Sequence, residues 1–319
     1  MAEPSPVSAE EKQTYRGNCH CGAFVFEAFI PEIKEVKVCN CSICIKKNYA
    51  FAIVPDADFK VVKGDIEKDL TVYKFDPALL SHMFCSNCGT AVLGTYTKMP
   101  GFTAINARAV QGPLDLWKMA KNKYNGVSYK PEYVPPPYDD MPEPATRFDD
   151  EPSGGKLYHG SCHCGDVRVA LRVPKPFDQD RAADFEQDPA RAIVECNCSL
   201  CQRTGATWIY PNRGQVVIKA RGGGDDPRGD AFSKAVGAYH VRLGSQVFCR
   251  RCGVYVANRL DISTDDEFAA LPEGLRAYMA DKRDWQPLNL RIFQDVELEG
   301  LNITEADGWN KIQPPYVNP

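Results

Sequence analysis

The sequence lacks the features that direct a chain to a secretory route, a membrane or a nucleic acid. Its first residues, MAEPSPVSAEEK, include neither a basic nor an apolar segment, so we expect no secretory signal. No stretch approaches the roughly 18 apolar residues that a membrane helix needs. The net charge is -4 over 319 residues, whereas a nucleic-acid-binding face needs an excess of cations. We therefore expect a cytoplasmic protein that binds no membrane and no nucleic acid.

Cysteine, by contrast, is abundant and strictly organised. The fourteen cysteines form two sets of seven, one in each half of the chain. Each set has the spacing C-x-C, then C-x-C-x2-C, then C-x2-C. The first set is Cys19, Cys21, Cys39, Cys41, Cys44, Cys85 and Cys88, and the second is Cys162, Cys164, Cys196, Cys198, Cys201, Cys249 and Cys252.

The sequence around the cysteines repeats as well. Both copies begin with Y-x-G-x-C-H-C-G, continue with C-N-C-S-x-C and reach F-C-x-x-C-G. This internal repeat indicates a tandem duplication, and a Pro-, Gly- and acid-rich stretch between the copies is typical of a linker. The predicted organisation is a disordered tail at 1–12, a first zinc domain at 13–138, a linker at 139–155 and a second zinc domain at 156–319.

The periodicity indicates a mainly β protein with few helices. Short segments rich in β-branched and aromatic residues, bounded by Gly or Pro, predict strands at 23–28, 166–171, 247–248 and 253–256. Short helices are expected at 42–47, 199–204 and 264–271, the last with Thr264 and Glu267 as a capping box. We expect zinc to join the ends of small antiparallel sheets.

Clustered cysteines favour metal binding over a framework of seven disulfides. Cytosolic thiols stay reduced, the chain is large enough to build a core without cross-links, and C-x2-C is a frequent zinc-ligand spacing. A redox role for C-x2-C would need a free thiol of low pKa, which a bound zinc would occupy.

Two assignments of the ligands compete. In the simpler one, the two pairs of each copy join into a closed, structural four-thiolate site, and the triple holds a second zinc with one open position, as catalytic sites do. In the other, the triple takes a fourth cysteine from a pair. A third alternative closes the triple with a His or a carboxylate from elsewhere. The simpler assignment predicts four Zn²⁺ per chain: structural sites at Cys19, Cys21, Cys85 and Cys88 and at Cys162, Cys164, Cys249 and Cys252, and open, catalytic sites at Cys39, Cys41 and Cys44 and at Cys196, Cys198 and Cys201.

Taken together, G-x-C-H-C-G, C-x-C-S-x-C-x-[KR] and F-C-x-x-C-G resemble the glutathione-dependent formaldehyde-activating enzyme family, which includes centromere protein V-like members. The resemblance covers nearly the whole chain outside tail and linker, twice. It implies two tandem Mss4-like β-tent domains, each with a closed four-cysteine zinc and a three-cysteine zinc that meets the thiol of glutathione.

The copies depart from one another near these motifs. After the triple the family pattern has a basic residue and a Gly; the second copy has Arg203 and Gly205, whereas the first has Lys46 and Asn48. Only the first copy has a His, His82, where the second has Gln246. Glutathione is anionic, so Lys46 and Arg203 are candidate thiol-substrate contacts; further candidate cations are Lys47, Arg250 and Arg251.

His20 and His163 each stand between two ligands. Alternation of side chains along an extended segment predicts that they point away from the metal of their neighbours, with a proton relay as the alternative. The recurring pairs Asn106/Arg108 and Asn289/Arg291 suit strand packing as well as substrate contact.

The predicted function is that of a zinc-dependent carbon–sulfur lyase similar to S-(hydroxymethyl)glutathione synthase. An open zinc favours the thiolate of a bound thiol, which would add to a small carbonyl such as formaldehyde, in detoxification or specialised metabolism. The competing hypothesis is a non-catalytic zinc-binding interaction module. The two copies could also form a pseudo-dimer within one chain.

Overall fold

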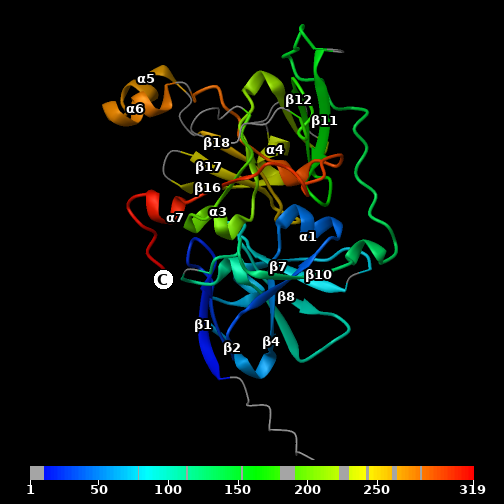
Figure 1. The fold of residues 1–319 in the computed structure, drawn as a ribbon, viewed down its shortest axis with the longest axis vertical. Helices are drawn as coiled ribbons and strands as arrows, with labels where there is room; N and C mark the ends of the chain where they lie inside the picture. The colour runs from blue at the N-terminus through cyan, green and yellow to red at the C-terminus, as the bar shows by residue number, and fades with distance from the viewer. Residues whose placement is uncertain are drawn as a thin grey trace, which may run out of the picture.

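The structure is a computed structural model of the whole chain. It describes residues 11–77, 79–112, 114–151, 154–179, 191–222, 230–241, 244–260, 264–280 and 282–319. Residues 1–10 of the predicted tail lie outside this part of the chain, and Lys12 begins the first strand. In Figure 1 the first copy (blue to cyan) lies below the second (green to red), and the C-terminal segment returns to the first copy beside β1.

Each copy contains a three-stranded and a seven-stranded sheet. In the first copy the small sheet has the order β1-β2-β5 and the large one the order β10-β3-β4-β9-β8-β7-β6. The bounds are β1 Lys12–Asn18, β2 Val25–Pro31, β3 Glu35–Cys39, β4 Phe51–Pro55, β5 Phe59–Lys63, β6 Leu70–Tyr73, β7 Leu80–Cys85, β8 Ala91–Tyr96, β9 Phe102–Asn106 and β10 Ala120–Tyr124.

The second copy repeats this topology strand for strand. Its sheets have the orders β11-β12-β15 and β16-β17-β18-β19-β14-β13-β20, which is the first-copy order traversed from the other edge. The bounds are β11 Lys156–Ser161, β12 Val167–Val173, β13 Val194–Cys196, β14 Trp208–Ile209, β15 Val216–Ala220, β16 Val236–Val241, β17 Gly244–Cys249, β18 Tyr255–Leu260, β19 Leu288–Asn289 and β20 Thr304–Ala306. The mainly β class with two similar halves is confirmed.

The helices are short. They are α1 Ser42–Lys47, α2 Ile66–Asp69, α3 Ser199–Thr204, α4 Asp230–Ala235, α5 Asp265–Ala269, α6 Glu273–Met279 and α7 Gly308–Lys311. The predicted capping box begins α5, where the Thr264 hydroxyl accepts from the Glu267 amide and the Glu267 carboxylate accepts from the Thr264 amide. α1 and α3 each contain the third cysteine of a triple, and they lie where the two copies meet (Figure 1).

The two copies pack through reciprocal contacts. The Phe84 and Phe248 rings, at equivalent positions, lie 6.4 Å apart edge to face. Each ring covers the glycine that follows the other copy's C-x2-C: a Cβ on Gly89 would lie 2.6 Å from Phe248, and a Cβ on Gly253 would lie 2.6 Å from Phe84. Phe84 also belongs to the buried cluster that forms the second-copy core. The hydrophobic core is therefore continuous across the boundary.

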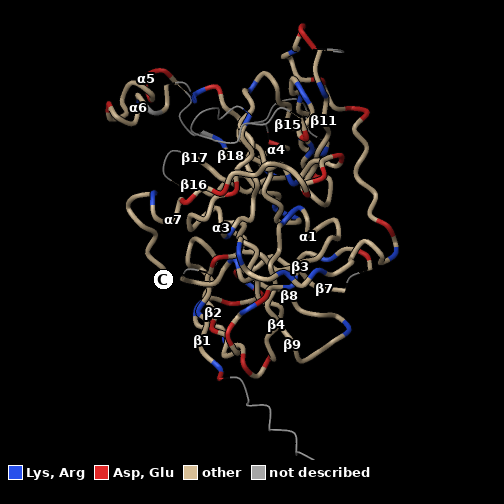
Figure 2. The backbone as a smooth tube through the Cα atoms, viewed as in Figure 1, with Lys and Arg blue, Asp and Glu red and all other residues tan. Residues whose placement is uncertain are grey.

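The segment between the copies is anchored to the second copy. Arg168, whose side chain is 8% exposed, forms a forked ion pair with Asp140, and Arg172 pairs with Glu143. The Arg168 guanidinium lowers the pKa of Asp140 to about 2. Figure 2 shows charges of both signs interspersed over the molecule. Within the described residues, no helix is long and apolar enough to cross a membrane.

Candidate metal centres and the cavity of the second copy

The structure brings the fourteen cysteines together in the four predicted groups. Within each group all the sulfur atoms lie within 4.8 Å of one another, and all fourteen are free of disulfides. The clusters are Cys19, Cys21, Cys85 and Cys88; Cys162, Cys164, Cys249 and Cys252; Cys39, Cys41 and Cys44; and Cys196, Cys198 and Cys201. The alternative in which a triple takes a cysteine from a pair does not match this grouping.

The four-cysteine clusters have the dimensions of a zinc site. Tetrahedral thiolates about 2.3 Å from zinc are about 3.8 Å from one another. The Sγ of Cys21 lies 3.6 Å from Cys19 and 3.6 Å from Cys85, and the Sγ of Cys164 lies 3.5 Å from Cys249. These groups could therefore hold zinc without rearrangement. Each would join the β1–β2 or β11–β12 turn to the end of β7 or β17.

The triples are placed at a strand-to-helix junction. Cys196 ends β13, and Cys198 is the N-cap of α3, which contains Cys201. The Cys201 amide donates to Cys198 Sγ at 3.4 Å. Hydrogen bonds from Cys196 and then Cys201 lower the pKa of Cys198 to about 3, which favours the thiolate that binds metal.

The first triple also contains one thiol of lowered pKa, which is the first cysteine of the motif rather than the second. Hydrogen bonds from Cys41 and then Cys44 lower the pKa of Cys39 to about 3. The thiolate-rich, three-ligand donor set suits zinc in both copies.

A glycine closes over each triple, which sequence reasoning missed. A Cβ on Gly308 would lie 2.5 Å from Cys196 Sγ, and a Cβ on Gly126 would lie 2.3 Å from Cys39 Sγ. The Asn between the first two cysteines holds this turn: Asn197 accepts from the Trp309 amide at 2.8 Å, and Asn40 accepts from the Val127 amide at 3.1 Å. The signal available in the sequence was the repeated C-N-C with a later Asn-Gly or Asp-Gly.

The two histidines extend into the opposite copy. His20 lies 3.2 Å from Ser199 Oγ and 3.0 Å from Tyr239 Oη. Burial, and then the charge of Arg203, lower the pKa of His20 to about 4, so the ring is neutral at physiological pH.

His163 makes the equivalent contacts in the other direction. Its Nε2 lies 2.9 Å from Ser42 Oγ and its Nδ1 lies 2.8 Å from Tyr73 Oη. Tyr133 stacks on His163 and donates to its carbonyl, as Tyr316 does for His20. Each triple therefore has beside it a histidine supplied by the other copy.

Lys46 and Arg203 also join the copies. Lys46 Nζ donates to the carbonyls of Ser161 and Ile292 at 3.0 and 2.8 Å. Arg203 donates to the carbonyl and side chain of Asn18, both at 3.1 Å. Both side chains are buried, with burial lowering the pKa of Lys46 to about 8. Lys46 donates between the copies, and Arg203 donates both between the copies and to Ser199 and Asn318 of its own copy. A contact of either side chain with the thiol substrate stays a prediction.

The other candidate residues have structural partners. Asn106 and Asn289 donate to the carbonyls of Ala91 and Tyr255, a role in strand packing. Arg291 pairs with Glu195 at 2.8 Å. The remaining candidate cations occupy four different environments. Arg108 donates to the Asn48 carbonyl, and Arg251 pairs with Asp166. Lys47 lies over the Phe84 ring, and Arg250 is exposed.

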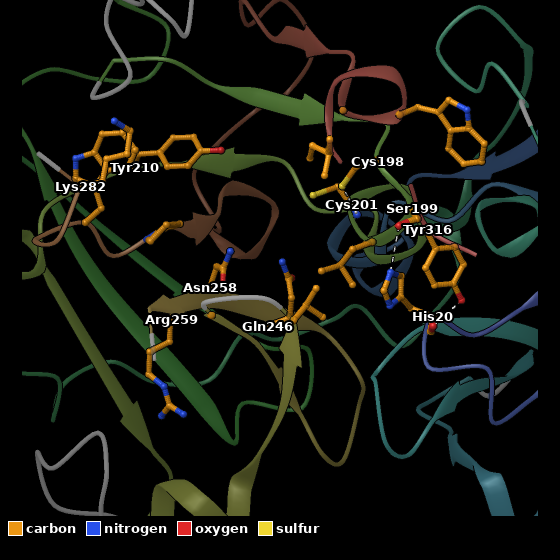
Figure 3. A pocket seen from close by; sticks show the side chains of 18 of the residues that line it. His20, Cys198, Ser199, Cys201, Tyr210, Gln246, Asn258, Arg259, Lys282 and Tyr316 are labelled. Carbon is orange, nitrogen blue, oxygen red and sulfur yellow. Dashed lines mark hydrogen bonds between the residues drawn. The ribbon is translucent and has the colours of Figure 1, made fainter. Parts of the chain in front are cut away.

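A cavity of about 660 Å³ reaches the second triple. Figure 3 shows Cys198, Cys201, Ser199, His20 and Tyr316 on one side of it, Tyr210 and Lys282 on the other, and Gln246 and Asn258 between them. Helix α6 and the segment after it contribute Met279, Lys282 and Trp285. These residues belong to an insertion between β18 and β19, where the first copy has only residues 97–101 between β8 and β9.

The fold and the four clusters define a protein of two similar β-rich halves, each with two cysteine groups that could hold metal ions. Residues 14–125 match the family described as glutathione-dependent formaldehyde-activating enzyme. The first copy is therefore similar to this family over most of its length. A crystal structure of a Rhodobacter sphaeroides protein is also similar: it is 27% identical, over 34% of this chain and 99% of that chain, with a TM-score of 0.31.

Proposed function

We propose that the protein is a zinc-dependent enzyme that joins or cleaves the carbon–sulfur bond between a carbonyl compound and glutathione or a similar thiol. The observation that carries the proposal is the position of Cys198 and Cys201 in the wall of a cavity large enough for a thiol adduct. The family match of residues 14–125 supports the thiol and the type of bond.

The reaction needs no oxidant or reductant. In the joining direction the sulfur of the thiol forms a bond to the carbonyl carbon, the carbonyl π bond breaks, and the thiol proton ends on the new hydroxyl group. Cleavage is the reverse. Zinc held by three thiolates supplies an open coordination position and favours the thiolate form of an entering thiol.

The protein's own residues position this chemistry. Cys196, Cys198 and Cys201 would hold the zinc of the second copy, and Cys39, Cys41 and Cys44 that of the first. Cys198 N-caps α3, and the His20 ring orients the Ser199 hydroxyl at the edge of the cavity.

The proposal includes a pseudo-dimer of the two copies. Its support is the exchange of equivalent side chains across the boundary: His20 contacts α3, and His163 contacts α1. Each site would then be complete only when both copies are folded.

The test combines zinc content with thiol binding in Cys41→Ser and Cys198→Ser variants. We expect four zincs per chain in the unaltered protein and loss of glutathione binding at the altered triple. Turnover of the glutathione–formaldehyde adduct, followed by NMR, should fall in Cys198→Ser. Two zincs per chain, or glutathione binding unchanged in both variants, would contradict the proposal and favour a non-catalytic zinc module.

A further inference from the structure

Several positions near the cavity carry smaller or non-aromatic side chains in the second copy than in the first. Equivalent positions follow from the shared cysteine spacing and strand pairing: His82 pairs with Tyr73 in the first copy, as Gln246 pairs with Tyr239 in the second. The same correspondence relates four residues of the first copy to four of the second: Tyr49 to Ala206, Phe75 to Val241, Leu80 to Gly244, and His82 to Gln246.

In the first copy these rings pack on one another beside the triple. Tyr49 stacks on His82 with ring centroids 5.3 Å apart, and Phe75 stacks on His82 at 5.8 Å. Phe75 also packs against His163 at 4.5 Å, the histidine that contacts α1. Two of these rings, Phe75 and His82, stand in the first copy at the positions of the cavity-lining residues Val241 and Gln246 in the second.

The walls of the second-copy cavity are largely aromatic. Tyr210, Trp285, Trp309 and Tyr316 line it, and Trp309 takes the place of Val127 in the first copy. Aromatic walls favour a ring in the ligand, because ring pairs in offset-stacked or edge-to-face geometry gain energy beyond that of burial alone. A volume of about 660 Å³ lies in the range of sites for drug-sized ligands.

The polar groups of the cavity suit the thiol half of an adduct. Lys282 lines it, with its ammonium 5.4 Å from the centroid of the Trp285 ring. An ammonium group in the wall complements the carboxylates of glutathione. Gln246 is 3% exposed, and its Oε1 has no hydrogen-bond partner among the described residues. A buried acceptor of this kind favours a ligand that brings a donor.

From these observations we infer that the second copy acts on thiol adducts of ring-bearing carbonyl compounds, such as aromatic aldehydes, and that Val241 and Gln246, which line the cavity, set this specificity. The inference rests on the proposed function and deepens it. The bond change is the one given above: addition of the thiol to an aryl aldehyde gives a hemithioacetal, with the thiol proton on the new hydroxyl group.

Binding tests the inference without relying on turnover. The probes are S-benzylglutathione and S-methylglutathione, two thioethers that differ in the ring, titrated into the zinc-loaded protein while fluorescence of the cavity tryptophans is followed. We expect the benzyl compound to bind at least about tenfold more tightly, as a filled apolar site discriminates by roughly 10–200-fold. Equal affinities would overturn the inference.

An aromatic side chain introduced into the second-copy cavity should remove the preference for S-benzylglutathione over S-methylglutathione. Val241→Phe restores the side chain that the first copy has at Phe75, and the tenfold preference should fall to about one. The matched control is Val72→Phe, the same substitution at a position 46% exposed on β6, which should keep the preference. A preference that survives Val241→Phe would overturn the inference.

A second variant tests the inference even if Val241→Phe fails to fold. Trp285→Leu removes an aromatic wall without filling the cavity, and it should lower the benzyl preference while zinc content stays at the unaltered value. Turnover of formaldehyde and benzaldehyde adducts separates the two proposals. Turnover of formaldehyde with no preference for the aryl group defeats the inference alone, whereas turnover of neither substrate defeats the proposed function as well.

Discussion

Gly308 offers a sharp test of how the open sites are built. Its Cβ, if present, would lie 2.5 Å from Cys196 Sγ and 2.8 Å from the Cβ of Cys198. Ordinary contacts between such atoms are about 3.5–4.0 Å, so in Gly308→Ala either the turn or Cys196 must move by about 1 Å. Zinc–sulfur distances tolerate about 0.2 Å. The thiolate would therefore leave its ligand position.

We expect Gly308→Ala to weaken zinc binding at the second triple by roughly 10–100-fold, the loss typical when groups that orient a ligand are altered. The assay is zinc release to a competing chromogenic chelator at equilibrium. One of the four zincs should be released at a lower chelator concentration, with the other three unchanged. The matched control is Gly274→Ala in α6, where nothing lies within 4 Å of the added carbon. Identical release curves for both variants would refute the reasoning.

Three further predictions concern the joining of the copies. Gly253→Ala should lower the free energy of unfolding by about 1–3 kcal/mol, because the added carbon would lie 2.6 Å from Phe84. The control for backbone strain is Gly101→Ala, since Gly101 also has a positive φ but has nothing within 4 Å of the added carbon. Equal losses of stability in the two variants would contradict the packing argument. Tyr255→Phe removes the hydroxyl that donates to the Cys88 carbonyl across the boundary and should cost about 1–3 kcal/mol in denaturant unfolding; no change would be inconsistent with a buried bond. Asp140→Asn should speed proteolytic cleavage between the copies relative to Asp139→Asn, since only Asp140 pairs with the buried Arg168; equal rates would show that the pair does not hold the segment.

The sequence predicted what depends on local spacing. The four cysteine groups follow from short motifs and their duplication, and all four are present. The capping box at Thr264 and Glu267 lies within one turn of helix, and it was also predicted. The triples and the capping box need only neighbours in the chain, whereas the four-cysteine groups, which join cysteines 64 and 85 residues apart, were predicted by counting zinc ligands.

Features that depend on distant contacts were not predictable in the same way. Lys46 was assigned to substrate by its position after the triple, yet its ammonium binds carbonyls 115 and 246 residues away. Predicting the difference between the copies at the cavity requires a comparison of Val241 with Phe75, and that comparison needs the pairing register of β16 and β6. Gly308 lies more than 100 residues from the cysteine it covers. Only the three-dimensional structure relates these positions.

The central claim is that each triple holds a metal ion with a position left for a thiol. It is tested most directly by cadmium-113 NMR of the protein with cadmium in place of zinc. We predict four signals, of which the two from the four-cysteine sites stay in place when glutathione is added, while the signal lost in Cys198→Ser shifts. Two signals in total, or four that glutathione leaves unchanged, would contradict the account.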